Sequence, residues 1–315
     1  MRKASRHKSS VRFLHRWQVD DERWNHTVSS SGFSMVYAMS WYLDACADYW
    51  AALVLEDYSH VMPVAYRRKL GFKYLYQPRF CQQLGIFSVQ EVDAQIIAGF
   101  LDTLKKHFRI GDYAFNEGNR LEASRTLPVT ENVNFVLGMN AAYETLSRAY
   151  SDNCRRNIKK AMQAGFEFSE DVSSRELVLL KKQHDHSRQP HKHYQSLIEM
   201  FSGMQEAGRV QAYGIKLEGE LCAGAIFARG HKRIHYLLSV STAKGKDFSA
   251  MFYLIDRVIQ MHSGKDLDLD FEGSNLESLA RFFRGFGAEP QHYQRIRFNN
   301  TAGKFVQKVR SVRPH

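Results

Sequence analysis

Three acidic residues alternate along the stretch LDLDFEG near the end of the chain. Because successive side chains of a strand point to opposite faces, Asp268, Asp270 and Glu272 share one face. Neighbouring carboxylates raise one another's pKa, and such a group can accept a proton near neutral pH. The stretch therefore predicts Glu272, at the strand end, as a catalytic general base, with Asp270 as a second catalytic candidate deeper in the strand. A salt bridge to Arg281 or Arg295 also explains these acids.

A glycine and two lysines precede an apolar helical pattern in the stretch STAKGKDFSAMFYLI. At a helix N-terminus, unpaired backbone N–H groups and the helix dipole attract anions. The predicted cofactor-binding residues are therefore Lys244, Gly245, Lys246 and Ser249, and the predicted ligand is an anion. An ordinary turn with Asp247 as the N-cap fits the same residues, so both interpretations remain open.

Two further groups of basic residues are spaced to share a helix face. The stretch SDNCRRNIKKAMQAG has basic residues four positions apart, which form a positive stripe on a helix. Such a stripe can follow the phosphates of tRNA or of a nucleotide-linked substrate, although a solvated face has the same pattern. In NLESLARFFRG, two arginines one turn apart can bind phosphate or carboxylate, or stabilise the helix C-terminus. The predicted substrate-binding residues are Arg155, Arg156, Asn157, Lys159, Arg281 and Arg284.

Composition limits the classes of protein. The chain has 44 Lys and Arg against 33 Asp and Glu, a net charge of +11, which favours anionic partners or serves solubility alone. No apolar run is long enough to span a membrane, and the basic N-terminus lacks the apolar segment of a secretory signal. The four cysteines are widely spaced, which argues against a disulfide framework and a zinc site. We therefore expect a cytoplasmic protein without a bound metal.

The elements that must position these residues form a repeated plan. The C-terminal half has the predicted order β-α-α-β-β-β-α-β-α-β, and the N-terminal half repeats much of it. Capping boxes at Ser88-x-x-Glu91 and Ser173-x-x-Glu176 predict the starts of two helices. The sequence predicts a basic arm over residues 1–20, an N-terminal domain over 21–145 and a C-terminal domain over 146–315, in a monomer.

This order of elements resembles the GNAT acyltransferase fold, and two copies in tandem resemble its FemAB-like branch. Three stretches carry the resemblance: YSDNCRRNIKKAMQAGFEF, LDFEGSNLESLARFFRGFGAEPQHYQRIR, and LVLEDYSHVMPVAYRRKLGFKYLYQPRFCQQLGIFS. The last is similar to a subgroup common in Bacteroidetes-type genomes. The resemblance implies an α+β protein of two tandem GNAT-like domains, each a mixed twisted sheet flanked by helices.

The resemblance also implies an N-acyltransferase. Such an enzyme moves an acyl or aminoacyl group from acyl-CoA or aminoacyl-tRNA to an amine of a small molecule or peptide, which makes tRNA a candidate partner. Two features depart from the family. The stretch around Gly245 lacks the R/Q-x-x-G-x-G/A spacing, and Phe283 stands where the tRNA-dependent transferases have a lysine. A non-catalytic GNAT-fold module that binds an anionic partner, such as tRNA or a nucleotide-linked cell-wall precursor, is therefore the alternative.

Overall fold

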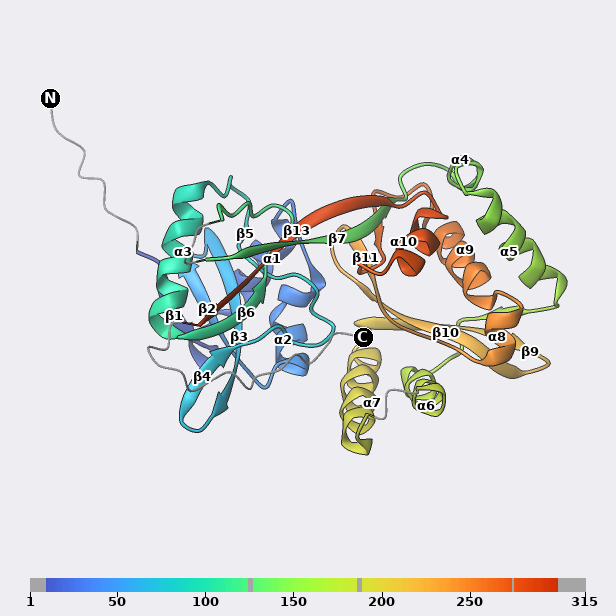
Figure 1. Ribbon diagram of the computed structural model, residues 1–315, viewed down its shortest axis with the longest axis horizontal. Helices are drawn as coiled ribbons and strands as arrows, with labels where there is room; N and C mark the ends of the chain where they lie inside the picture. The colour runs from blue at the N-terminus through green and yellow to red at the C-terminus, as the bar shows by residue number, and fades with distance from the viewer. Residues whose placement is uncertain (1–9, 124–126, 186–188, 274, 300–315) are drawn as a thin grey trace, which may run out of the picture. The chain divides into compact units, whose positions relative to one another are not determined.

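The computed structural model describes residues 10–123, 127–185, 189–273 and 275–299 (Figure 1). The chain divides into two compact units. Unit 1 comprises Met1–Asn132 together with His292–His315, and unit 2 comprises Val133–Gln291. Two strands, β7 (Val129–Gly138) and β13 (Glu289–Asn299), each begin in one unit and end in the other.

Unit 1 is a mixed sheet with helices packed on it. Its strands follow the order β1 (Arg12–His15), β2 (Tyr49–Leu55), β3 (His60–Lys69), β4 (Phe72–Leu75), β6 (Ile110–Ala114) and β13, with β5 (Phe87–Ser88) paired to β3. Neighbours are antiparallel except β4 and β6, which meet in parallel at Leu75 and Gly111. The helices are α1 (Asp21–Ser30), α2 (Ser40–Cys46) and α3 (Ala94–His107), with 3-10 turns η1 (Arg16–Gln18) and η2 (Val36–Ala38).

Unit 2 repeats this plan. Its strands follow the order β7, β12 (Asp268–Asp270), β11 (Arg233–Ser241), β10 (Glu220–Arg229), β9 (Val210–Leu217) and β8 (Glu167–Ser169), all antiparallel except the β11–β12 pair. The helices are α4 (Tyr143–Arg148), α5 (Asp152–Gln163), α6 (Ser174–His184), α7 (His191–Glu206), α8 (Ala243–Asp247), α9 (Ala250–His262) and α10 (Glu277–Arg284).

The order of elements predicted for the C-terminal half is confirmed, with the short helix α8 as an addition. The two closing strands have different partners from those expected. The strand β7, predicted to close the N-terminal domain, pairs with β12 in unit 2. The last strand, β13, pairs with β6 in unit 1. The contacts therefore divide the chain differently from the predicted boundary at residue 145, because an alternating pattern indicates a strand without indicating its neighbour.

Helix starts are set by local hydrogen bonds. The capping box at Ser173 and Glu176 is present at the start of α6. The one expected at Ser88 is wrong, since α3 begins later with Asp93 as its N-cap, whose side chain accepts a hydrogen bond from the backbone of Ile96. Asp93 provides the cap because its carboxylate reaches the unpaired N–H groups of the first turn.

An aromatic cluster holds α10 on the sheet of unit 2. Phe271, which follows β12, stacks on Phe283 of α10 with ring centroids 4.8 Å apart. Both side chains are buried, together with Phe286. The position at which the tRNA-dependent transferases have a lysine is therefore part of the apolar core in this chain.

Candidate functional site

Strands β11 and β12 run in parallel for only a short distance and then part. Their register joins Arg233 to Asp268 and His235 to Asp270, where β12 ends. Strand β11 continues from Tyr236 to Ser241, and over the described residues only β10 pairs with this portion. One edge of β11 is thus available to hydrogen-bond an extended chain, as another strand would.

Two side chains that the sequence did not single out lie at this edge. Tyr236 follows the last parallel pair, and its burial raises its pKa to about 12, so the phenol keeps its proton at neutral pH. Lys181 of α6 donates a hydrogen bond to the carbonyl oxygen of Ser239 at 3.2 Å, and burial lowers the pKa of its ammonium group. The edge therefore carries a proton donor and a half-buried cation.

Asp270 is fully buried and held by three groups. Asn134 Nδ2 lies 3.0 Å from both carboxylate oxygens, the backbone N–H of Glu272 donates at 2.8 Å, and Arg233 Nη1 lies at 3.3 Å. Burial raises the pKa of Asp270, while Arg233 and the hydrogen bonds oppose that increase. The arginine partner is Arg233, not the expected Arg281 or Arg295, and these contacts fix the carboxylate at the end of β12.

Glu272 lies at the strand end, as predicted, and is half-buried. Its φ of +54° is in the left-handed region, which is uncommon for a residue other than glycine. The next residue, Gly273, is required because a Cβ there would lie 2.3 Å from the Cα of Asn134. Asn134 accepts a hydrogen bond from the Gly273 backbone at 2.7 Å, so a single side chain fixes both Asp270 and the turn after it.

The predicted cofactor loop contains the short helix α8. Its N-cap is Thr242, whose hydroxyl accepts from the backbone of Gly245, and Asp247 is the last helical residue, so the expected Asp247 cap is wrong. Gly245 is buried, and a Cβ there would lie 2.2 Å from the carbonyl oxygen of Cys222. Gly245 therefore lets α8 pack closely on β10, while Lys246 is exposed and Lys244 is half-buried.

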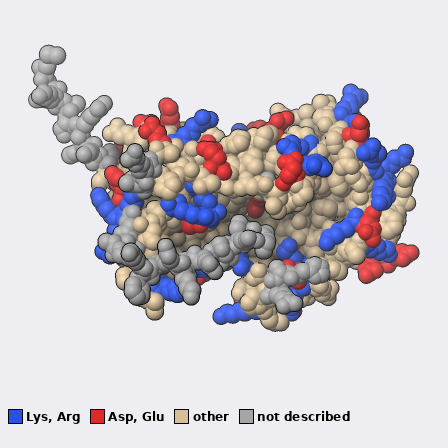
Figure 2. All heavy atoms as spheres, in the orientation of Figure 1, with Lys and Arg blue, Asp and Glu red and all other residues tan. Residues whose placement is uncertain are grey.

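The predicted residues of α5 and of the cofactor loop meet directly. Ser249, the N-cap of α9 with a φ of +60°, donates a hydrogen bond from its hydroxyl to Asn157 Oδ1 at 2.7 Å. One turn along α5, Lys160 lies 5.8 Å from the ring centroid of Phe248. Figure 2 shows basic side chains gathered over α5, where Arg156 and Lys159 are exposed.

The remaining predicted arginines have local partners or face solvent. Arg155 donates to the carbonyl oxygens of Arg148 and Tyr150 and pairs with Asp152 at 2.6 Å, so it supports the connection from α4 to α5. On α10, Arg284 pairs with Glu277, and Arg281 is exposed. All three arginines are exposed, and Arg155 and Arg284 are also engaged in ion pairs.

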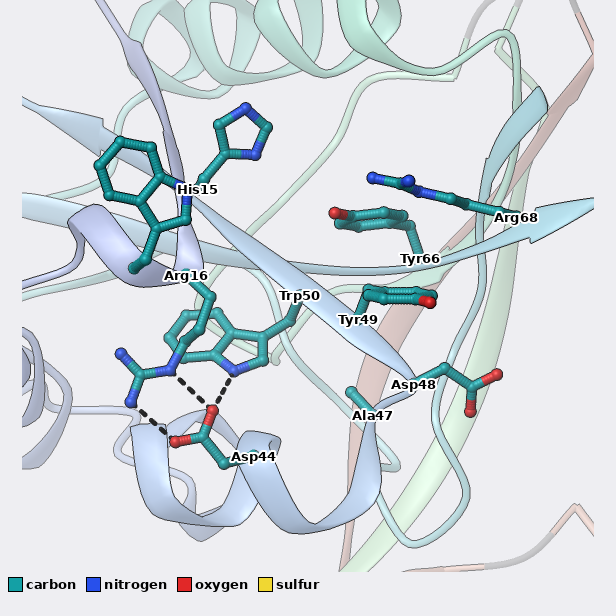
Figure 3. A pocket seen from close by; sticks show the side chains of 10 residues that line it. His15, Arg16, Asp44, Ala47, Asp48, Tyr49, Trp50, Tyr66 and Arg68 are labelled. Carbon is teal, nitrogen blue, oxygen red and sulfur yellow. Dashed lines mark hydrogen bonds and ion pairs between the residues drawn. The ribbon is translucent and has the colours of Figure 1, made fainter. Parts of the chain in front are cut away.

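Unit 1 has a surface hollow of about 530 Å³ at the end of α2 (Figure 3). Asp44 accepts hydrogen bonds from Arg16 and from Trp50 Nε1, each at 2.7 Å. Tyr49 and Tyr66 stack with centroids 5.6 Å apart, and their parallel rings are visible in Figure 3. Both acids that line this hollow are in ion pairs, Asp44 with Arg16 and Asp48 with Arg67.

Among the described residues, no cluster of three or more His, Cys, Asp or Glu side chains has the arrangement of a metal site. Within the same residues, no helix has the length and hydropathy required to cross a membrane.

Together, the two units form an α+β GNAT fold in two tandem halves. More particularly, residues 148–276, which lie within unit 2, match the family model described as an acetyltransferase (GNAT) domain. No curated protein sequence matches the chain.

Solved structures similar to this chain cover nearly its whole length. FemX is 12% identical with a TM-score of 0.62, over 90% of this chain and 96% of FemX. A conserved protein of unknown function from Bacteroides thetaiotaomicron is 8% identical with a TM-score of 0.60, over 92% and 100% of the two chains. A tandem GNAT protein from the clavulanic acid biosynthesis pathway is 10% identical with a TM-score of 0.54, over 94% and 100%. At these identities the likeness establishes the fold alone.

Proposed function

We propose that the chain is an N-acyltransferase whose unit 2 binds an activated acyl donor. The observation that carries this proposal is the edge of β11 from Tyr236 to Ser241, which lies within the acetyltransferase family match. The pantetheine arm of acyl-CoA is an extended chain with two amides, and such a chain can hydrogen-bond to an unpaired strand edge.

The donor phosphates would lie at the start of α9. This helix has 13 residues, and its first N–H groups and dipole favour an anion. Lys244 and Lys246 precede it, and Lys160 approaches Phe248 from α5. In this proposal Ser249 and Asn157 fix the position of the helix start through their hydrogen bond, and Gly245 fixes α8 beneath it.

The transfer needs a base and an acid on opposite sides of the acyl carbon. The acceptor amine attacks the thioester carbonyl, so that a C–N bond forms and the C–S bond breaks. Glu272 accepts the proton that the amine loses, and the Tyr236 phenol, whose pKa is about 12, supplies a proton to the departing thiolate. Asp270 serves as a positioning residue through Asn134, and Arg156, Lys159 and Arg281 contact the anionic parts of donor or acceptor.

Acyl-CoA is the donor that we favour over aminoacyl-tRNA. Phe283 is packed against Phe271 in the core, so α10 provides no cation at the position where the tRNA-dependent transferases have one. The acceptor is an amine of a small molecule or peptide. The placement in the FemAB-like branch and its Bacteroidetes-type subgroup is part of the same proposal.

A thermal-shift titration tests the donor. We expect acetyl-CoA or a longer acyl-CoA to raise the melting temperature of the wild-type chain, and the Lys244→Ala, Lys246→Ala double variant to reduce that increase. Lys265→Ala is the matched control, because Lys265 is an exposed lysine of unit 2 outside the proposed site. No shift with any acyl-CoA, together with binding of aminoacyl-tRNA that weakens steeply with salt, would transfer the donor assignment to tRNA.

The alternative is a non-catalytic module that binds an anionic partner. Two observations favour it, because each gives a predicted site residue a role in packing. Asp270 is held in a buried hydrogen-bond network, and Gly245 packs closely against β10. A chain of this kind would bind tRNA or a nucleotide-linked precursor through the basic face of α5 and would transfer no acyl group. Salt-sensitive RNA binding without acyl transfer to any amine tested would support it.

A further inference from the structure

Two cysteines of unit 1 lie next to each other although they are 35 positions apart. The Sγ atoms of Cys46 and Cys81 are 3.4 Å apart, close enough for an S–H···S hydrogen bond. Cys46 is the last residue of α2 and is half-buried, whereas Cys81 is buried in the segment after β4. The other two cysteines, Cys154 and Cys222, lie in unit 2.

We propose that Cys46 and Cys81 form a reversible disulfide when the protein meets a low-molecular-weight disulfide such as oxidised glutathione. A disulfide needs a sulfur separation of about 2.05 Å, so the two sulfurs must approach by a little more than an ångström. The proposal uses only residues of unit 1 and does not depend on the acyl transfer proposed for unit 2.

The difference in exposure sets the order of the two steps. Cys46, as a thiolate, attacks one sulfur of oxidised glutathione, forms a mixed disulfide and releases one glutathione thiolate. Cys81 then loses its proton and attacks Sγ of Cys46, which releases the second glutathione. Two protein thiols become one disulfide, and the two electrons and two protons pass to glutathione.

The bond would fasten a segment that already fills a gap in the sheet. Cys81 lies between Gln77, which contacts its carbonyl oxygen and the backbone of Ala114, and Leu84, which forms a parallel bridge with Phe115 just after β6. On the other side of the bond, Cys46 directly precedes Ala47 and Asp48, which line the hollow of unit 1. Oxidation would therefore join α2 covalently to this segment beside the hollow.

The test uses the full chain at fixed ratios of oxidised to reduced glutathione. After acid quenching and alkylation with N-ethylmaleimide, the intact mass counts the remaining thiols. We expect the count to fall from four to two at oxidising ratios, with a peptide containing Cys46 linked to one containing Cys81, and to return to four with dithiothreitol. In Cys81→Ser, Cys46 should instead retain a glutathione adduct, whereas Cys46→Ser should keep Cys81 unmodified.

Cys154 and Cys222 are the internal controls, because burial raises the pKa of both thiols and makes them poor nucleophiles. Alkylation of all four cysteines at every ratio would overturn the proposal. A link between any other pair, or between two chains, would also overturn it. Because the wild-type protein supplies the deciding measurement, poor folding of either serine variant leaves the test valid.

Discussion

Each unit contains one pair of parallel strands that separate after a short paired stretch. The two units differ in what lies between the strands after they separate. In unit 1, where β4 and β6 meet at Leu75 and Gly111, the chain itself returns to fill the gap. The backbone of Leu84 hydrogen-bonds the carbonyl oxygen of Ala114 at 2.9 Å, and the side chain of Gln77 accepts from the Ala114 backbone at 3.0 Å. In unit 2, over the described residues, no strand takes this place beside β11 after His235.

The residues after the two corresponding strands reflect the same difference. Strand β6 is followed by Phe-Asn-Glu-Gly at 115–118, and β12 by Phe-Glu-Gly at 271–273. The extra residue, Asn116, donates hydrogen bonds from its side chain to the carbonyl oxygens of Leu84 and Ile86, which fixes the returning segment. The two units therefore share one order of strands, but a segment of the chain fills the gap in unit 1, whereas unit 2 has a free edge on β11. We propose that acyl transfer takes place at this free edge.

The largest expected effect is on the turnover number, which should differ between variants of the two glutamates that follow these strands, Glu272 and Glu117. Glu272→Gln should lower the turnover number by about 10²–10⁴, the contribution of a general base, and leave the melting temperature nearly unchanged. Glu117→Gln in unit 1 is the matched control and should retain wild-type turnover. Steady-state acyl transfer to an amine acceptor measures both. Loss of activity in Glu117→Gln with retention in Glu272→Gln would reverse the assignment of the units.

The next effect concerns the buried network that holds β12. Asp270→Ala leaves the Arg233 guanidinium, which is only 8% exposed, without its buried partner, and should lower the free energy of unfolding by about 3–5 kcal/mol. Asp268→Ala should cost less than about 1 kcal/mol, since Asp268 is 40% exposed and 3.8 Å from Arg233. Urea unfolding of the two variants provides the comparison, and equal losses would contradict the network.

A smaller effect is expected from a variant that disturbs the close contact between α8 and β10 in unit 2. Gly245→Ala should lower the free energy of unfolding by about 1–3 kcal/mol, because the new Cβ collides with the carbonyl oxygen of Cys222. Gly203→Ala in α7 has no atom within 4 Å of the new Cβ and should gain about 0.5–1 kcal/mol. If both variants were equally stable, the packing account of Gly245 would be incorrect.

The units should also differ in pH dependence. Hydrogen bonds from Arg16 and Trp50 overcome the effect of burial and lower the pKa of Asp44 in unit 1. Asp44 therefore stabilises the fold above about pH 4, the range of an unfolded aspartate, and this stabilisation is lost as the pH falls through the lowered pKa. In unit 2, burial raises the pKa of Asp256 despite the hydrogen bond from Tyr143, so its contribution is present below about pH 4 and lost as the pH rises.

Thermal unfolding of Asp44→Asn and Asp256→Asn between pH 3 and pH 8 measures these opposite slopes. Relative to the wild type, Asp256→Asn should become more stable as the pH rises, and Asp44→Asn less stable. Parallel curves for the two variants would show that the two acids do not differ in this way.

Much of the fold follows from the sequence, whereas the contacts within the candidate site do not. Alternation and capping predicted the order of elements in the C-terminal half and the start of α6 at Ser173. They did not predict that β7 and β13 pair in the opposite units, because period-two patterns report the buried face and not the neighbouring strand. For the same reason Asp270 was recognised as an acid on a strand, but its partners Arg233 and Asn134 are 37 and 136 positions away. A charged residue at the start of the apolar stretch RIHYLLSVS was the available signal for Arg233.

Amide hydrogen exchange with and without saturating acetyl-CoA tests the central claim, that unit 2 binds the donor along the free edge of β11. We predict slower exchange at residues 236–241 and at the start of α9 when the ligand is present. Exchange at residues 84–86 and 110–116 of unit 1 should stay unchanged, because the chain itself already fills that gap. Slower exchange confined to unit 1, or binding of acetyl-CoA without any change at residues 236–241, would contradict the account.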